Sequence, residues 1–262
     1  MREVFGDSGP AVLLLPGGAE AVEGFYPGLM EGLMADPGCR VILYDRPGVG
    51  PSEAEGGLAE ATDAIHATLA ELKIGPVVVI GQSLGGAVAM LLARDHPEDV
   101  AGLVLLDPTP VNDAKLAKQV EQTAKTTARI STVPGIHWAL TALLRSSAGR
   151  SARRHDMSPE ARTATLKIAE VDLPKLSQSA TGLAAIAEGF DESQLPLVPA
   201  AVVTADRKPD STIRKAHARI AAALETPLLS WPGAEHQVHL SHEEEVLEVS
   251  RAVVRAVAVS EE

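Results

Sequence analysis

Ser83, a serine with a glycine two residues before it and another two residues after it, is the best candidate in this sequence for a catalytic side chain. Ser83 is the centre of Gly81-Gln82-Ser83-Leu84-Gly85, which follows an apolar run and precedes a stretch of helical spacing. A sharp turn between a strand and a helix exposes a serine hydroxyl, and it needs glycines because side chains would collide with both elements. The helix N-terminus adds amide donors where an oxyanion would form. We therefore predict that Ser83 is a nucleophile rather than a simple helix cap.

A serine nucleophile needs a base, and His236 is the best-placed histidine. It follows a predicted strand and the Pro232-Gly233 turn and precedes the last predicted helix, so we expect it on a loop. His239 and His242 fall toward or within that helix, where a packing or solvated role is expected. Three further histidines are expected on surface helices: His66, His96 and His217. We predict His236 as the base that activates Ser83.

Two aspartates could orient the base. Asp107 directly ends an apolar run and has no cation near it in the sequence, and its alternative role is to cap the following turn. Asp206 follows the penultimate predicted strand, but it precedes Arg207 and Lys208, which could hold it in solvent. An acid of this kind must be shielded to orient an imidazole well. We favour Asp107 and keep Asp206 as the alternative acid.

These residues need a scaffold that brings distant loops together. Short apolar runs alternate with alanine-rich stretches of helical spacing, which indicates βαβ units around a mainly parallel sheet flanked by helices. Nearly continuous apolar runs are typical of parallel strands buried on both faces. The predicted strands cover residues 3–5 (in an edge hairpin), 11–15, 41–44, 77–80, 103–106, 200–204 and 227–230. The predicted core helices cover residues 58–72, 84–95, 213–224 and 243–257.

About ninety residues between two predicted core strands have no strand pattern, which is too long for a loop in a compact domain. We interpret residues 111–195 as a helical lid inserted into an α/β core of residues 1–110 and 196–262. An apolar stretch of the lid around Trp138 could line a substrate pocket from above. The alternative is that Trp138 belongs to the lid's own core.

The sequence resembles the α/β-hydrolase superfamily over nearly its whole length. Besides residues 81–85, three motifs carry the resemblance: Leu13-Leu14-Leu15-Pro16-Gly17-Gly18, the stretch from Tyr44 to Ser52, and Gly233-Ala234-Glu235-His236-Gln237-Val238. The resemblance implies that the N–H groups of Gly18 and Leu84 form the oxyanion hole. Pro16 stands where the family usually has histidine, which affects the support of the loop rather than the donor itself.

The resemblance leaves the acid open. The family's usual acid corresponds to a position that here holds Lys208, close to Asp206. Some members carry their acid after the strand that follows the nucleophile helix, which corresponds to Asp107. The resemblance also implies that no cofactor is required.

The composition limits the partners of the chain. A net charge of −12 argues against nucleic acid and against anionic membrane surfaces, because phosphates would be repelled. No apolar run is long enough to span a bilayer, and no signal peptide is evident, so we expect a cytoplasmic protein. The single cysteine, Cys39, forms no internal disulfide, and no metal-ligand spacing appears.

We therefore expect a serine hydrolase that cleaves an ester-like bond of a small organic substrate through an acyl-enzyme. The same residues could instead cleave a carbon–carbon bond in a diketone or make peracids without a cofactor. A ligand-binding protein without catalysis is also consistent with this fold. The sequence indicates neither the substrate nor the oligomeric state.

Overall fold

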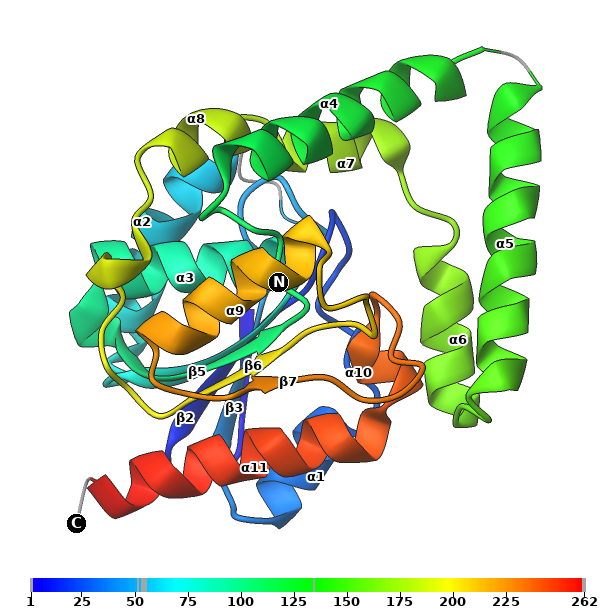
Figure 1. The fold of residues 1–262 in the computed structure, drawn as a ribbon. Helices are drawn as coiled ribbons and strands as arrows, with labels where there is room; N and C mark the ends of the chain where they lie inside the picture. Colours follow the sequence, from blue (N-terminus) through cyan, green and yellow to red (C-terminus); the bar gives the residue numbers. More distant parts are fainter. Residues whose placement is uncertain (1, 51, 53–55, 134, 261–262) are drawn as a thin grey trace.

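The computed structural model describes residues 2–50, 52, 56–133 and 135–260, and a seven-stranded sheet forms its centre (Figure 1). The strand order is β1-β3-β2-β4-β5-β6-β7, and all pairings are parallel except that of β1 with β3. The strands are β1 (Arg2–Phe5), β2 (Ala11–Leu15), β3 (Arg40–Tyr44), β4 (Val77–Gln82), β5 (Val100–Leu106), β6 (Ala200–Val203) and β7 (Leu228–Leu229). This confirms the predicted α/β fold with a mainly parallel sheet.

The predicted edge hairpin is wrong, because β1 pairs with β3 rather than with its neighbour in sequence, β2. Pro51 of the motif at residues 44–52 and Pro134 of the predicted lid lie outside the described residues.

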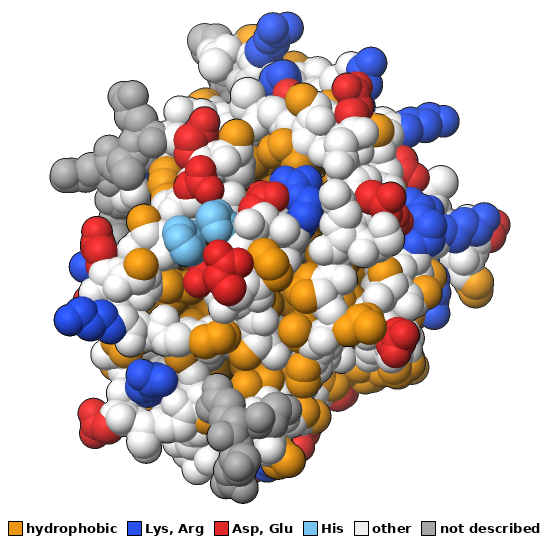
Figure 2. Space-filling view, turned by 90° about the vertical axis from the view of Figure 1, so that its left-hand side faces the viewer, with side chains coloured by type: hydrophobic (Ala, Val, Ile, Leu, Met, Phe, Trp, Pro, Cys, Tyr) orange, Lys and Arg blue, Asp and Glu red, His pale blue; other side chains and the backbone are white. Residues whose placement is uncertain are grey.

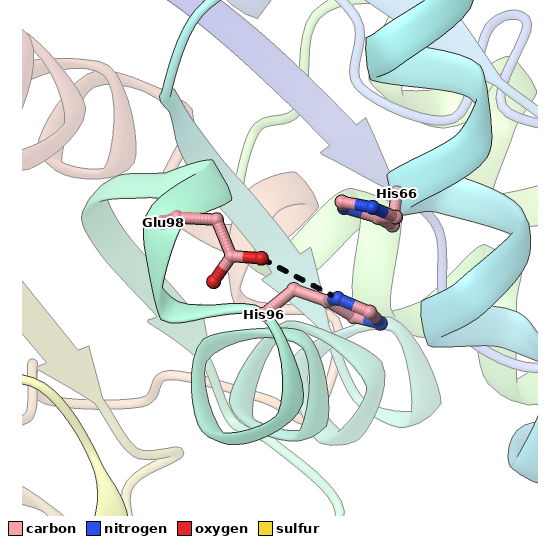
Figure 3. Close-up of side chains that lie close together, drawn as sticks. All are labelled: His66, His96 and Glu98. Atoms are coloured by element: carbon pink, nitrogen blue, oxygen red, sulfur yellow. Dashed lines mark ion pairs between the residues drawn. The ribbon is translucent and has the colours of Figure 1, made fainter.

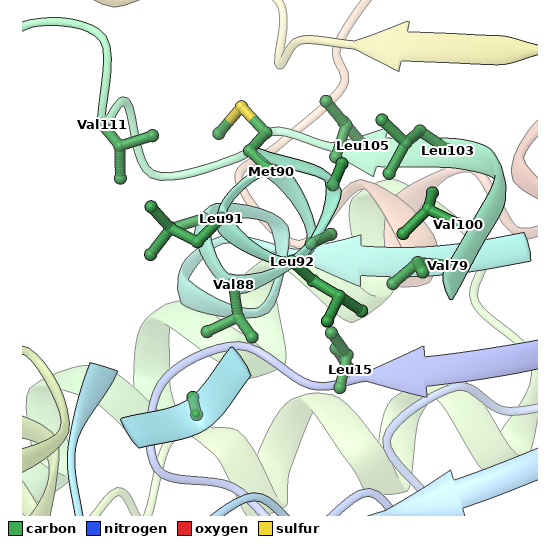
Figure 4. Close-up of a cluster of buried hydrophobic side chains, with 14 of the residues drawn as sticks. Leu15, Val79, Val88, Met90, Leu91, Leu92, Val100, Leu103, Leu105 and Val111 are labelled. Atoms are coloured by element: carbon green, nitrogen blue, oxygen red, sulfur yellow. The ribbon is translucent and has the colours of Figure 1, made fainter. Parts of the chain in front are cut away.

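Helices cover both faces of the sheet because its strands are apolar on both sides. In β4, Val79 belongs to the hydrophobic cluster on one face and Val78 to that on the other. Figure 4 shows the first cluster, in which side chains of the helix after β4, such as Met90, pack near β5. The first face is covered by α2 (Leu58–Leu72), α3 (Leu84–Asp95) and α9 (Thr212–Ala223), and the second by α1 (Leu29–Ala35) and α11 (Glu243–Ser260).

A helical segment lies between β5 and β6, as Figure 1 shows in green and yellow-green. Its helices are α4 (Ala114–Ser131), α5 (Ile136–Arg154), α6 (Pro159–Ile168), α7 (Leu173–Ser179) and α8 (Leu183–Glu188). α4 packs against α7 and α8, while α5 packs against α6. The remaining short helices are η1 (Pro97–Asp99), η2 (Glu192–Gln194) and α10 (Val238–Ser241). The function of residues 111–195 as a lid stays a prediction.

The parallel arrangement brings the carboxyl ends of β2, β4, β5 and β6 to one edge of the sheet. The residues that follow these ends are therefore neighbours in space, although they are far apart in sequence. Among the described residues, no helix has both the length and the apolar character needed to cross a membrane.

Candidate active site

The turn that carries Ser83 is tight and depends on its glycines. Ser83 lies between β4 and α3 with φ 51° and ψ −117°, which non-glycine residues rarely adopt. A Cβ atom on Gly81 would lie 2.5 Å from the carbonyl oxygen of Gly85, and one on Gly85 would lie 2.1 Å from that of Leu15. The Ser83 N–H donates to the Leu106 carbonyl at 3.2 Å. Strand, turn and helix together hold the hydroxyl at the carboxyl edge of the sheet.

Ser83, His236 and Asp107 form a continuous chain of hydrogen bonds. His236 Nε2 lies 3.0 Å from Ser83 Oγ, and His236 Nδ1 lies 2.6 Å from Asp107 Oδ2. The Gln82 side chain holds the histidine loop by donating to the His236 carbonyl at 2.9 Å. Because a carboxylate only accepts, Nδ1–H donates to Asp107, and the lone pair on Nε2 faces the Ser83 hydroxyl. The three side chains thus have the geometry needed to move a proton from Ser83 to His236.

The second candidate acid lies elsewhere. Asp206 is exposed, and its Oδ2 accepts from the Gly233 N–H at 2.8 Å, while its own N–H donates to the Ala234 carbonyl at 2.7 Å. Asp206 therefore ties the loop after β6 to the turn that precedes His236. Among the described residues, the structure brings Asp107 and not Asp206 to the imidazole.

Asp107 is almost fully buried and has a cationic partner that the sequence did not reveal. Arg207 makes two hydrogen bonds to its carboxylate, one to Oδ1 and one to Oδ2 at 2.6 Å, and the Ala205 N–H donates to Oδ1 at 2.9 Å. Burial alone would raise the pKa of Asp107, but hydrogen bonds from His236 and Arg207 outweigh it and hold the pKa well below its usual range. Arg207 therefore pairs with Asp107 rather than with Asp206, although Asp206 is exposed as expected.

Two buried histidines lie close to this chain of hydrogen bonds. His217, expected on a surface, is fully buried, with Nε2 2.7 Å from the Pro108 carbonyl and Nδ1 2.9 Å from Thr204 Oγ1. Burial lowers its pKa. His239 stacks on Phe25 with ring centroids 4.6 Å apart, and neither of its nitrogens has a hydrogen-bond partner among the described residues. Burial lowers the pKa of His239 to about 3, so it stays neutral.

The predicted oxyanion donors both border the same pocket as Ser83. Leu84 is the first residue of α3, so its N–H has no acceptor within the helix. Gly18 has a φ of 58°, and its carbonyl accepts from Arg46 Nη2 at 2.6 Å, while Arg46 Nη1 donates to the Pro16 carbonyl at 3.1 Å. This buried arginine supports the loop in which Pro16 replaces the family's usual histidine.

The pocket beside Ser83 has a volume of about 620 Å³ and lies between the sheet edge and the helical segment. Apolar side chains from α4 to α7 make up much of its wall, including Leu116, Val120, Leu144, Ile168, Leu173 and Leu176. Threonine and serine hydroxyls add polar points, and none of the described lining residues is a lysine or arginine. The prediction that Trp138 lines the pocket is not met, because Trp138 is 76% exposed and is not among the lining residues.

One cluster outside the pocket has side chains that could bind a metal ion. His66, His96 and Glu98 lie close together (Figure 3), and Figure 2 shows two histidine side chains side by side near acidic ones. The two imidazole rings are stacked with centroids 4.3 Å apart, so their lone pairs lie in parallel planes and do not converge. His66 Nδ1 lies 2.7 Å from Asp99, and His96 Nε2 lies 2.9 Å from Asp63. We assign no metal ion to this cluster.

Known proteins resemble this chain in part or throughout. Lipase LipV of Mycobacterium tuberculosis is 37% identical over 116 residues, which are 44% of this chain and 44% of that protein. A 2-hydroxy-6-oxo-6-phenylhexa-2,4-dienoate hydrolase of Comamonas testosteroni is 33% identical over 108 residues, 38% of this chain and 37% of that protein. The matched stretches thus span less than half the length of these curated relatives. A thermophilic esterase from Thermogutta terrifontis has the same fold, with a TM-score of 0.70 at 22% identity over 98% of this chain and 93% of that chain.

A sequence model described as alpha/beta hydrolase fold matches residues 10–156, more than half of the chain. The matched range includes the Gly18 loop, the Ser83 turn and Asp107. The chain therefore belongs to the alpha/beta hydrolase family.

Proposed function

We propose that this chain is a serine hydrolase that cleaves the ester bond of a small organic molecule through an acyl-enzyme. Ser83 Oγ attacks the acyl carbonyl while His236 Nε2 takes its proton, and the N–H groups of Gly18 and Leu84 donate to the oxyanion. His236 then protonates the leaving alcohol, and water repeats the attack on the acyl-enzyme. Asp107 orients the imidazole and stabilises the imidazolium.

The observation that carries this proposal is the unbroken chain of hydrogen bonds from Asp107 through His236 to Ser83 at the wall of a sizeable pocket. A serine is a weak nucleophile unless a base lies within hydrogen-bond reach and a third group orients that base. Both conditions are met by Ser83, His236 and Asp107, which follow different strands. The names of the relatives, a lipase and a dienoate hydrolase, agree with hydrolysis as the reaction class.

The lining of the pocket favours ester cleavage over carbon–carbon cleavage. The dienoate in the name of the second relative carries a carboxylate, which needs a cationic partner in a largely apolar pocket. The described lining residues include two carboxylates, Glu20 and Glu235, and no lysine or arginine. An uncharged acyl group fits this pocket better than an anionic one. With a net charge of −12, a small neutral substrate is also favoured over nucleic acid, and a cytoplasmic location stays a prediction.

The test is hydrolysis of short p-nitrophenyl esters together with labelling by a fluorophosphonate. Ser83→Ala should lower turnover by about 10⁴ and abolish labelling, because the nucleophile is lost. Ser147→Ala is the matched control: Ser147 lines the same pocket but has no described hydrogen bond to a histidine, so its loss should leave both readouts nearly unchanged.

Three outcomes would contradict the proposal. Labelling of a serine other than Ser83 would mean that the nucleophile is wrong. Turnover of a diketone without turnover of any ester would favour the carbon–carbon reaction. Binding of esters with neither turnover nor labelling would favour a ligand-binding protein.

A further inference from the structure

Arg207 is the one described cation in direct contact with the carboxylate that faces His236. Its two terminal nitrogens bind both oxygens of Asp107, and the bond to Oδ2 and that from His236 Nδ1 are both 2.6 Å long. The guanidinium and the imidazole therefore share one oxygen atom and lie within a few ångströms of each other. The Arg207 side chain is 23% exposed and the Asp107 side chain 1%, so water screens this contact only weakly.

This contact has a geometric and an electrostatic consequence. A two-pronged arginine–carboxylate pair fixes the plane of the carboxylate, which in turn sets the direction of the hydrogen bond to His236. The guanidinium also neutralises much of the negative charge of Asp107. An imidazolium beside this ion pair is therefore less stabilised than one beside a carboxylate alone.

We propose that Arg207 is a positioning residue of the hydrolase, which holds the Asp107 carboxylate in plane and extends the activity to lower pH by disfavouring protonation of His236. The inference rests on the proposed function, since it requires His236 to act as the base. Only the neutral imidazole can accept the Ser83 proton, so a cation that disfavours imidazolium keeps the base competent as the pH falls.

Other charged or titratable groups near the imidazole do not replace Arg207. His217 and His239 are buried, and burial lowers the pKa of both, so it disfavours the charged form of each. Glu235 precedes His236, but its carboxylate accepts from Ser151 at 2.6 Å and pairs with Arg154 at 3.2 Å. These contacts direct it toward α5 rather than toward the imidazole.

A neighbouring arginine supports the position of Arg207. Arg214 of α9 donates to the Arg207 carbonyl at 3.0 Å, which helps to fix the loop after β6. Thr204 Oγ1 lies 3.3 Å from Arg207 Nη1 and 2.9 Å from His217 Nδ1. Arg214 thus fixes the backbone of Arg207, and Thr204 accepts a hydrogen bond from its guanidinium, as expected of a side chain that must keep one orientation.

Two substitutions separate geometry from charge. Arg207→Lys keeps the positive charge but removes the planar fork, so kcat should fall about tenfold while the acid limb of the kcat/KM profile stays in place. Arg207→Met removes both, so kcat should fall and the acid limb should move to higher pH by about one unit. Lys208→Met is the matched control, because it removes the same charge from an exposed neighbour and should change neither quantity.

The measurement is kcat/KM for a p-nitrophenyl ester across about pH 4.5 to 9, with circular dichroism to confirm folding. An acid limb that does not move in Arg207→Met, or that moves as far in Lys208→Met, would overturn the proposal. Failure of the proposed function is distinguished from this result, because it would appear as absent turnover and absent Ser83 labelling in the unmodified protein.

A second comparison tests Arg207 in the Asp107→Asn background and does not depend on the folding of Arg207→Met alone. In Asp107→Asn the guanidinium has lost its counter-charge and lies close to His236, so it should hinder imidazolium formation. Adding Arg207→Met to Asp107→Asn should therefore leave activity unchanged or raise it several-fold, although the same change lowers activity in the unmodified protein. A further loss of activity when Arg207→Met is added to Asp107→Asn would mean that Arg207 does not act through Asp107.

Discussion

Replacing Asp107 by asparagine keeps the size of the side chain but leaves one acceptor oxygen and one NH₂ group. The oxygen is needed at the Oδ1 position, where the Ala205 N–H donates at 2.9 Å and Arg207 also donates. The NH₂ group then faces His236 Nδ1, which must accept a hydrogen bond instead of donating one. The imidazole proton moves to Nε2, and His236 can no longer take the proton of Ser83.

The loss of the correct tautomer should lower kcat by about 10³ to 10⁴, which corresponds to about 4–5 kcal/mol of transition-state stabilisation. The assay is turnover of a p-nitrophenyl ester, with thermal unfolding as the check on folding. Asp206→Asn is the control, because the Gly233 N–H, which donates to Asp206 Oδ2 at 2.8 Å in the unmodified protein, can still donate to the remaining amide oxygen. It should cost less than about tenfold. The reverse ranking, with both proteins folded, would refute this reasoning and give the acid role to Asp206.

Leu176→Trp should shift preference toward shorter acyl chains, because Leu176 lines the pocket next to Gly18. Trp138→Ala should leave the ratio of kcat/KM for short and long esters unchanged, because Trp138 is exposed outside the pocket. A shift in the second variant only would contradict the pocket assignment. His239→Phe should reduce the loss of stability on acidification. The unfolded chain protonates this histidine near pH 6.5 but the folded chain only near pH 3. The free energy of unfolding of the unmodified protein therefore falls by about 1.4 kcal/mol for each pH unit between these two values. Urea unfolding at several pH values measures this, and equal slopes in both proteins would refute it. Gly85→Ala should destabilise the fold by about 3 kcal/mol, because the new Cβ would collide with the Leu15 carbonyl. Gly149→Ala should stabilise the fold by up to about 1 kcal/mol, because Gly149 lies within α5 and a Cβ there has room. Both effects are measured by denaturant unfolding, and a free energy of unfolding of Gly85→Ala equal to that of the unmodified protein would contradict the tight turn.

Features encoded by neighbouring residues could be predicted from the sequence. The bounds predicted for α2 and α3 agree with the structure, and the Ser83 turn depends on glycines only two residues away. The parallel strands were recognisable because burial on both faces requires continuous apolar runs. The short helix α1 was not predicted, since seven residues with an internal glycine, Gly32, give little periodic signal.

Features that depend on the packing of distant elements could not be predicted. The pair of Arg207 with Asp107 joins residues one hundred positions apart, and its only signal was a cation and an acid after two successive core strands. His217 lies on an amphipathic helix, but the sequence does not say which side of that helix meets the sheet. Trp138 was misplaced for the same reason, because the packing of α5 against α6 and α4 decides which of its faces is exposed.

The position of the acid follows from the register of the sheet. Leu106 of β5 pairs with Val203 of β6, so Asp107 and Thr204 emerge side by side at the edge that carries Ser83. A carboxylate after either strand can therefore approach His236, which explains why the sequence left two candidates. Two carboxylates there would repel each other and raise the cost of ionising both. In this chain the loop after β6 instead directs the Ala205 N–H and the Arg207 guanidinium at Asp107. Both groups donate hydrogen bonds to the carboxylate and therefore favour its ionised form. The loop that resembles the family's usual source of the acid thus supports an acid carried by the neighbouring strand.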